Sequence, residues 1–301
     1  MLSICIPSYQ CDVNELLTTL QNQAIQFPER IIEILVVDDA SNPPIAINDD
    51  LVSSVRLIRN PSNLGRSKTR NVLCGEARGT HLLFIDCDSK IISDHFLKNW
   101  FAISDQIETA VAYGGSIYQD ETPPSEQFLR WKISTSKESK TFEQRKLSAG
   151  AFKTNNFLIK RSLCEKIQFN EQLNGYGHED TLFGFEILEL GEYIHQIDNP
   201  VLNCVLDTNE VFLDKTQQAI ENLVLCRSLV EDKVGFEQYV RILSIHKRIS
   251  QFGMSSILVL GQKIFGKWLY NRLKTGNPFC LVAFFDLHKL MTLNQLLRKV
   301  D

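Results

Sequence analysis

Long apolar runs are missing from this sequence. None approaches the roughly 18–20 residues that a helix needs to cross a bilayer, and the longest candidate near the C-terminus, FCLVAFF from residue 279, is far shorter. The first residues, MLSICIPSYQC, also lack the basic region of a secretory signal peptide. These absences predict a cytoplasmic protein that is either soluble or peripheral on the inner face of the cytoplasmic membrane.

An excess of basic residues and a metal-binding cysteine pattern are absent as well. The formal net charge is −4, so nucleic acid is not expected as a partner. The eight cysteines form no CxxC pair and no zinc-ligand spacing. Several lie inside apolar stretches such as SICIP and NPFCLVAFF, which predicts reduced cysteines in the core of an intracellular protein.

Short apolar runs do alternate with amphipathic segments. The runs at 2–7, 31–37 and 82–85 predict buried strands, and the segments at 11–23 and 66–79 carry apolar residues at helical spacing. Continuous apolar strands that alternate with helices predict an α/β fold, with a mostly parallel sheet covered by helices. A chain of 301 residues is long enough for one large or two smaller domains.

Four aspartates follow the ends of two predicted strands. Asp38 and Asp39 lie in VVDDAS, and Asp86 and Asp88 follow the apolar run of LLFIDCDS. Parallel sheets bind ligands at the carboxyl ends of their strands, and Mg²⁺ and Mn²⁺ prefer carboxylate oxygens. The structural alternatives are Asx turns and a cap for a helix expected near 93–101. A phosphoacceptor receiver domain also has paired early aspartates, but it would be much shorter than this chain.

A third acidic motif, GHED, lies at 177–180 before an apolar helical segment. Glu179 and Asp180 suit the first turn of a helix, where the helix dipole favours negative charge, and they need no function there. A carboxylate beside a loop with Gly175 and Gly177 can also act as a general base toward a hydroxyl. Taken alone, the motif leaves both interpretations open.

Five motifs occur in one order along the chain: SICIPSY, VVDDAS, NLGRSKTRN, FIDCDS and GYGHEDTLFGFEILELG. Together they resemble glycosyltransferase family 2. The resemblance implies a GT-A fold over residues 1–210, with a Rossmann-like, mixed but mostly parallel sheet flanked by helices, and a helical region over residues 211–301. It also implies an inverting, metal-dependent transferase of the hexosyltransferase type. Such an enzyme would use a nucleotide sugar, with UDP as the expected nucleotide, to extend a surface polysaccharide or another glycan.

The resemblance also implies where the nucleotide sugar binds. Pro7 and Tyr9 would flank the base, and the pair Asp38 and Asp39 would contact the nucleoside. The segment NLGRSKTRN matches the part of the family that lies next to the nucleotide, and its matching residues are Asn63, Gly65 and Arg70.

The same resemblance assigns the chemistry. Asp86 and Asp88 match the DxD motif, in which Asp88 is the expected ligand of Mn²⁺ or Mg²⁺ and Asp86 lies nearer the ribose or sugar. Glu179 and Asp180 match the ED motif, whose aspartate is the expected catalytic base. A metal would neutralise the charge on the departing diphosphate, and the base would take the proton of the attacking hydroxyl.

One position departs from the family pattern. Many members have a histidine metal ligand some distance after the ED motif, where this chain has Asn203 in NPVLNCVLD. An amide oxygen can bind Mg²⁺ or Mn²⁺ but supplies no imidazole. His195 and His178 are alternatives, although His195 also fits a core position and His178 could instead contact the acceptor. The substitution supports an alternative function, that of a catalytically idle nucleotide-sugar-binding or scaffold protein on this fold.

Two further segments carry expectations. The charged stretch TSKESKTFEQRK at 135–146 is interpreted as a mobile segment. In SSILVLGQKIFGKWLYNRLKTG, one helix face is expected to carry Ile264, Phe265, Trp268, Leu269 and Leu273, with Lys263, Lys267, Arg272 and Lys274 elsewhere. That helix either packs on the GT-A domain or lies in a membrane interface with its basic residues toward lipid headgroups. A helix in the membrane interface would suit a lipid-linked acceptor. A helix packed on the GT-A domain would be compatible with any acceptor glycan.

Overall fold

The computed structural model describes residues 1–106, 109–147, 151–276, 279 and 281–300. Packing divides the chain into two compact units. The sheet unit comprises Met1–Tyr118, Ser139–Gln172 and Phe183–Cys204. The helical unit comprises Gln119–Glu138, Leu173–Leu182 and the described part of Val205–Asp301. Each unit consists of three separate segments of the chain, so this division does not test a single boundary. The domain boundary expected at residue 210 stays a prediction.

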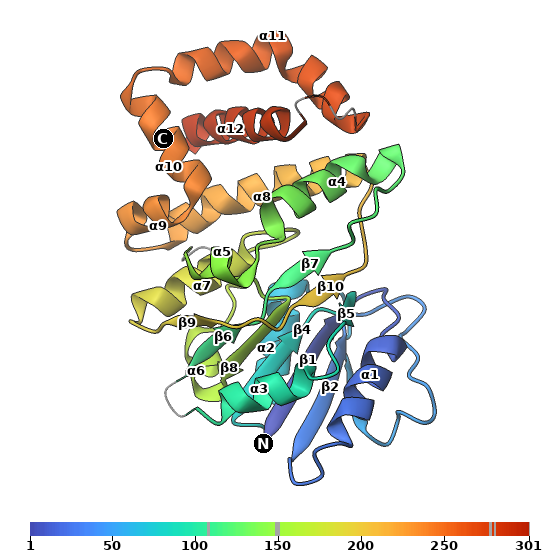
Figure 1. Cartoon of the computed structure of the whole chain (residues 1–301). Coiled ribbons are helices and arrows are strands. Elements are labelled where there is room, and N and C mark those ends of the chain that lie inside the picture. The colour runs from blue at the N-terminus through green and yellow to red at the C-terminus, as the bar shows by residue number, and fades with distance from the viewer. Residues whose placement is uncertain (107–108, 148–150, 277–278, 280, 301) are drawn as a thin grey trace. The chain divides into compact units, whose positions relative to one another are not determined.

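A seven-stranded sheet with the order β3-β2-β1-β4-β8-β6-β9 organises the sheet unit (Figure 1). Its strands are β1 (Leu2–Ser8), β2 (Ile32–Asp38), β3 (Val55–Arg59), β4 (His81–Ile85), β6 (Val111–Tyr113), β8 (Asn156–Lys160) and β9 (Ile194–Gln196). Only β8 runs against its neighbours β4 and β6, and the other pairings are parallel. The predicted mostly parallel sheet is therefore confirmed.

Both faces of the central strands are buried, which explains their unbroken apolar sequences. Ile4 and Ile6 of β1 point into a cluster that includes side chains of α1 (Asn14–Ala24) and α3 (Phe96–Ser104). Cys5, between them, points into the cluster on the opposite face. That second cluster includes side chains of α2 (Arg66–Glu76), α6 (Arg161–Ile167) and α7 (Glu179–Glu189). Successive strand residues face opposite sides, so a strand with helices on both sides needs apolar residues throughout.

A second, three-stranded sheet has the order β5-β10-β7. It consists of β5 (Ser89–Ile91), β10 (Val201–Asn203) and β7 (Ser116–Tyr118). Asn203 pairs with Ser89 in the antiparallel β10–β5 ladder. This register joins a residue late in the sheet unit to the segment that directly follows the DCD motif.

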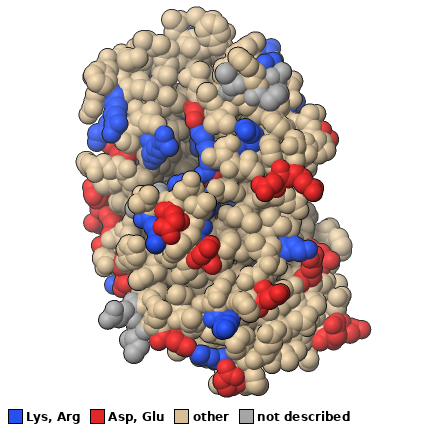
Figure 2. Space-filling view, viewed as in Figure 1, with Lys and Arg blue, Asp and Glu red and all other residues tan. Residues whose placement is uncertain are grey.

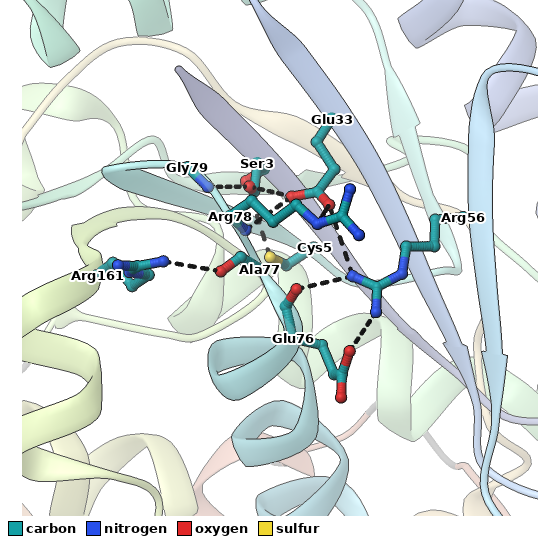
Figure 3. Close-up of polar contacts among 9 residues, drawn as sticks. All are labelled: Ser3, Cys5, Glu33, Arg56, Glu76, Ala77, Arg78, Gly79 and Arg161. Atoms are coloured by element: carbon teal, nitrogen blue, oxygen red, sulfur yellow. Dashed lines mark hydrogen bonds and ion pairs between the residues drawn. The ribbon is translucent and has the colours of Figure 1, made fainter.

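The amino edge of the main sheet is closed by a network around Glu33 (Figure 3). Its carboxylate accepts hydrogen bonds from the Ser3 hydroxyl at 2.6 Å and the Arg78 backbone N–H at 2.9 Å. The Arg56 guanidinium lies 3.7 Å from Glu33 and also pairs with Glu76. Gly79 is required there, because an added Cβ would lie 2.7 Å from the Ser3 nitrogen. The network ties β1, β2 and β3 to the turn between α2 and β4.

The charged stretch at 135–146 is not merely a loop. It contains α5 (Phe142–Lys146), which begins with a capping box between Thr141 and Gln144. Arg145 of α5 is buried and donates hydrogen bonds to the carbonyls of Gly114 at 3.0 Å and Ile197 at 2.6 Å. The interpretation of this segment as mobile was therefore wrong for α5, which a buried guanidinium fastens to the end of β6.

Helices make up the helical unit, as predicted for the C-terminal region. They are α4 (Phe128–Ile133), α8 (Asn209–Leu229), α9 (Lys233–Tyr239), α10 (Arg241–Gln251), α11 (Ser255–Lys274) and α12 (Leu281–Val300). Leu129, Leu213, Leu269, Leu273 and Phe285 contribute to their common core. Among the described helices, none combines the length with the apolar character that a membrane span requires. Cys5, Cys74, Cys164 and Cys226 are buried, as expected for core cysteines, whereas Cys204 is exposed. Cys280 lies outside the described residues.

Candidate active site

The DCD motif forms a turn at the carboxyl end of β4. Asp86 directly follows Ile85, and its backbone N–H donates to the Asn155 carbonyl at 3.1 Å. The Asp86 side chain is 29% exposed, and that of Asp88 is also partly exposed. Cys87, between them, packs against the apolar cluster. A hydrogen bond with Cys11 and burial raise the pKa of the Cys87 thiol, so it stays protonated and leaves the carboxylates as the candidate ligands.

Arg70 holds Asp86 in place. Its guanidinium donates to the Asp86 carboxylate at 2.9 Å, although Arg70 itself is only 2% exposed. The same guanidinium lies over the Phe169 ring at 5.5 Å, and Phe169 stacks on Phe183 of α7 at 4.0 Å. A buried cation is retained where it has a carboxylate partner. Arg70 therefore orients the first acid of the motif.

The register of the small sheet brings Asn203 to this turn. The Cys204 N–H, next along the chain, donates to the Asp88 carbonyl at 3.3 Å. The Asn203 side-chain oxygen accepts from the Asn155 amide at 3.4 Å. His195 lies on β9, which β8 and β6 separate from β4. Of these two candidates, the structure brings Asn203 and not His195 beside the DCD turn.

The side chains at this turn fit Mg²⁺ or Mn²⁺ bound partly by the substrate. Two partly exposed carboxylates and an amide oxygen are hard oxygen donors. The buried side-chain oxygen of Asn155 accepts no hydrogen bond from a described residue. Within the described parts of the chain, no three His, Cys, Asp or Glu side chains gather as a metal site. One or two carboxylates plus substrate phosphates is the common way in which proteins hold Mg²⁺.

The paired aspartates after β2 are enclosed rather than open. Asp38 is 1% exposed and accepts hydrogen bonds from the N–H groups of Ser41 at 2.9 Å and Ile45 at 3.1 Å. Burial opposes its ionisation, but these hydrogen bonds and the Arg59 charge hold the pKa of Asp38 below its ordinary value. Asp38 thus fixes the turn that follows β2.

Asp39 fixes the neighbouring NLG loop in the same way. It accepts hydrogen bonds from the N–H groups of Leu64 at 2.8 Å and Gly65 at 2.9 Å, and from the Asn60 amide at 2.7 Å. Gly65 has a φ of +84° and directly precedes α2, a conformation that favours glycine. The structure therefore brings Asp39 and Gly65 together, and their role as nucleotide contacts stays a prediction.

The remaining expected nucleotide contacts lie at the same edge of the sheet. Pro7 lies in β1, where it pairs with Val37, and Tyr9 follows the strand with 47% of its side chain exposed. Asn63 is exposed in the loop before α2. An exposed aromatic ring at the carboxyl edge is available to stack on a base.

In the helical unit, α7 begins at the ED motif. Glu179 is buried, whereas Asp180 is partly exposed and accepts a hydrogen bond from the Thr181 N–H at 2.7 Å. Burial and the Asp180 charge raise the pKa of Tyr239, at the end of α9. Burial, together with Lys289 of α12, lowers the pKa of His178 to about 4. His178 is therefore neutral near pH 7, and its Nδ1 lies 3.0 Å from the Thr181 hydroxyl.

A single side chain of α8 clamps the loop before α7. The Asn222 amide donates to the carbonyls of Asn174 at 2.9 Å, Tyr176 at 3.3 Å and Gly177 at 3.1 Å. Gly177 has a φ of +95°, and an added Cβ would lie 2.7 Å from the Ala219 Cβ. Local sequence patterns carry no signal for Asn222, because its partners lie more than 40 residues earlier in the chain.

Comparison with known proteins agrees with this arrangement. The family model described as Glycosyl transferase family 2 matches residues 3–168, just over half of the chain. The chain belongs to glycosyl transferase family 2. The matched range contains the SICIPSY, VVDDAS, NLGRSKTRN and FIDCDS motifs and ends before the ED motif.

Two curated relatives support membership of glycosyl transferase family 2. One is an uncharacterized glycosyltransferase of Haemophilus influenzae, 36% identical over 90 residues, which are 29% of this chain and 29% of that protein. The other is the poly(ribitol-phosphate) beta-N-acetylglucosaminyltransferase TarS of Staphylococcus aureus. It is 33% identical over 116 residues, 35% of this chain and 19% of TarS. The chain thus spans less than a third of the length of either relative.

Solved structures show the fold of this family 2 chain. The structure of residues 1–349 of S. aureus TarS with UDP superposes with a TM-score of 0.50 at 19% identity, over 100% of this chain and 92% of that one. The mannosyltransferase PcManGT of Pyrobaculum calidifontis, in complex with GDP-Man and Mn²⁺, gives 0.55 at 14% identity, over 99% and 86% of the two chains. The predicted GT-A fold with a helical C-terminal region is confirmed.

Proposed function

We propose that this chain is an inverting glycosyltransferase that transfers a sugar from a UDP-sugar to a hydroxyl acceptor in surface polysaccharide or glycan biosynthesis. The observation that carries the proposal is the DCD turn, where two partly exposed carboxylates and Asn203 meet at the carboxyl edge of the sheet. Support for the donor comes from TarS, whose structure contains UDP. Support for a divalent cation comes from PcManGT, whose structure contains GDP-Man and Mn²⁺.

In this proposal the DCD turn holds the diphosphate end of the donor. Asp88 is the direct ligand of Mn²⁺ or Mg²⁺, Asp86 lies nearer the ribose or sugar, and Asn203 is an additional oxygen donor. A divalent cation held by these residues would supply positive charge to offset the charge on the departing nucleoside diphosphate. Arg70 keeps the Asp86 carboxylate oriented through their 2.9 Å hydrogen bond. Tyr9 and Pro7 flank the base, and Asp38 and Asp39 shape the loops around the nucleoside.

Asp180 is the proposed general base. It takes the proton from the acceptor hydroxyl while that oxygen attacks the anomeric carbon, which leads to inversion. Glu179 is buried beside it and supports the start of α7. The neutral imidazole of His178 offers the acceptor a hydrogen bond without adding positive charge, in keeping with its pKa of about 4. In this proposal, Asp180 acts on the acceptor and the DCD turn acts on the donor.

The acceptor is proposed to be a glycan or a lipid-linked glycan on the cytoplasmic side of a membrane. Donor and acceptor selectivity is expected in residues 114–155 and in the loop before the HED residues. Peripheral association through the C-terminal helices would place the enzyme near a lipid-linked acceptor.

The test combines binding and transfer. A thermal-shift panel of nucleoside diphosphate sugars with Mg²⁺ or Mn²⁺ identifies the donor, because a ligand that binds only the folded state raises Tm. With that donor, Asp180→Asn is expected to keep the thermal shift and to lose transfer. The anomeric configuration of the product, read by NMR, decides between inversion and retention. Undiminished transfer by Asp180→Asn would remove Asp180 as the base, and stabilisation by none of the donors would remove the proposed substrate class.

A further inference from the structure

The outer face of α11 is apolar and exposed. Ile257, Leu260, Ile264, Phe265 and Trp268 recur at helical spacing, and each is between 55% and 60% exposed. The opposite face is already used, since Leu258, Leu269 and Leu273 are buried in the core of the helical unit. Most of the surface of these outer side chains therefore stays exposed, although the Trp268 ring also packs edge to face on Phe284 of α12 at 5.6 Å. The single apolar face expected for this helix is thus divided, with Leu269 and Leu273 in the core.

The apolar surface continues beyond both ends of α11. Phe252 and Met254 precede the helix with 80% and 45% exposure, and Phe279 follows it with 69%. Among the described residues, 22 large apolar side chains are exposed, and eight of them lie between residues 252 and 279, less than a tenth of the chain. Scattered exposed apolar residues need no explanation, but a concentration of this kind marks an interaction surface. We call residues 252–268 and Phe279 the α11 surface.

Charge is segregated along the same stretch. Residues 238–285 contain seven Lys or Arg and no Asp or Glu, in a chain with a net charge of −4. Two of these cations, Lys247 and Lys274, pair with Glu237 and Glu210. Lys263 and Lys267 lie on one flank of the apolar face, are exposed, and form no ion pair with a described residue. Figure 2 shows the region of α11 as mostly uncharged, with Lys and Arg side chains beside it.

From this combination we infer that the α11 surface binds an anionic lipid bilayer. Trp, Phe, Ile and Leu would enter the boundary between headgroups and acyl chains, and the flanking lysines would contact anionic headgroups. Lys and Arg side chains near such a surface are attracted by its negative potential. A second copy of the chain is a poorer occupant, because it would place one acid-free basic stretch against another. A neutral apolar groove would leave Lys263 and Lys267 without counter-charges.

This surface would account for the proposed peripheral association, but its test needs neither donor nor acceptor. The protein is mixed with vesicles of equal parts phosphatidylglycerol and phosphatidylcholine, or of phosphatidylcholine alone, and bound protein is measured by cosedimentation. We expect binding to the anionic vesicles that weakens with salt and is at least tenfold weaker on neutral ones. A blue shift of tryptophan emission should accompany binding and disappear in Trp268→Phe.

Paired variants separate the two parts of the surface. Ile264→Glu with Trp268→Glu removes apolar contact, and Lys263→Glu with Lys267→Glu reverses charge; each pair should weaken vesicle binding at least tenfold. The matched controls are Ile31→Glu, at a position 69% exposed on the sheet unit, and Lys98→Glu on α3, and both should bind like the unaltered protein. A circular dichroism spectrum and a Tm like those of the unaltered protein verify that the variants fold.

Three outcomes would overturn the inference. They are no binding of the unaltered protein to anionic vesicles, binding that neither double variant weakens, and a concentration-dependent dimer that Ile264→Glu with Trp268→Glu dissociates. The last outcome would assign the surface to self-association. A negative vesicle result would leave the proposed transfer reaction untouched, since sugar transfer is measured without vesicles.

Discussion

Carboxylates lie at both edges of the main sheet, but Glu33 at the amino edge and Asp86 at the carboxyl edge differ in their exposure and in their number of partners. At the amino edge, Glu33 is 10% exposed and meets two hydrogen-bond donors and two guanidinium groups. At the carboxyl edge, Asp86 has Arg70 as a partner and still keeps 29% of its side chain exposed. An acid enclosed by donors contributes to stability, whereas an acid that keeps solvent access can still receive a ligand.

Position at the carboxyl edge is therefore not sufficient to make an acid a ligand. Asp38 and Asp39 lie at this edge as well, yet both are buried and accept hydrogen bonds from backbone N–H groups. In this respect they resemble Glu33. The loops that they fix are the ones next to the expected nucleotide. At this one edge, Asp38 and Asp39 thus hold the loops in place, whereas Asp86 stays accessible to a ligand.

The largest effect is expected for Asp88→Ala, which tests whether a solvent-accessible acid at the carboxyl edge binds a ligand. If Asp88 binds the cation, turnover should fall at least about 100-fold, a loss of several kcal/mol of transition-state stabilisation. Metal-dependent stabilisation by UDP should disappear as well, while the Tm without ligand should barely change. Asp94→Ala, an exposed acid nearby in sequence, is the control and should keep full activity. Normal turnover of Asp88→Ala would refute the metal assignment.

The complementary change at the amino edge is Glu33→Ala. It leaves the Ser3 hydroxyl and the Arg78 N–H without their acceptor and separates the charges of Arg56 and Arg78 from their partner. The expected loss of unfolding free energy is about 2–4 kcal/mol, with turnover at 20 °C within about twofold of normal. Denaturant unfolding measures the first and steady-state kinetics the second. Glu29→Ala, at an exposed position in the turn before β2, should change neither.

Asn222→Ala extends the comparison to the loop before α7. Losing three hydrogen bonds at once should loosen the start of the helix that carries Asp180. We expect transfer to fall about tenfold, because the base is no longer held in position, while stabilisation by UDP with Mn²⁺ is unchanged. Glu221→Ala, exposed on the same helix, serves as control. A variant with normal transfer and only a lower Tm would limit Asn222 to a structural role.

The smallest effect is expected at Glu186 of α7, a partly buried acid that lies near a second acid, Glu189. Burial and the nearby Glu189 raise its pKa to about 7. Because the folded state holds this proton more tightly than the unfolded state, stability is full at low pH and falls as pH rises from about 4.5 to 7. Glu186→Gln should remove this loss and raise Tm at pH 8 by a few degrees, with no gain at pH 4. Glu192→Gln, on the loop that follows, should leave the pH profile unchanged.

Local sequence patterns predicted the strands, most helices and the acids at strand ends, since these depend on residues close together in the chain. Arg145 and Asn222 could not be found in this way. Arg145 bonds to Gly114 and Ile197, and Asn222 to a loop in another part of the chain, so their roles exist only after folding. The capping box of α5 was readable from Thr141 and Gln144. Asn203 was identified from its place in a motif, but its nearness to the DCD turn required the β10–β5 register.

The single reversed strand has a consequence for how such an enzyme can diversify. Because β8 runs against β4, its first residue, Asn156, pairs with Ile85, and the preceding Asn155 touches Asp86. The residues just before β8 therefore lie beside the DCD turn. If that turn binds the donor as proposed, exchanges at these residues would change the surroundings of the donor without altering the pairing of the strands.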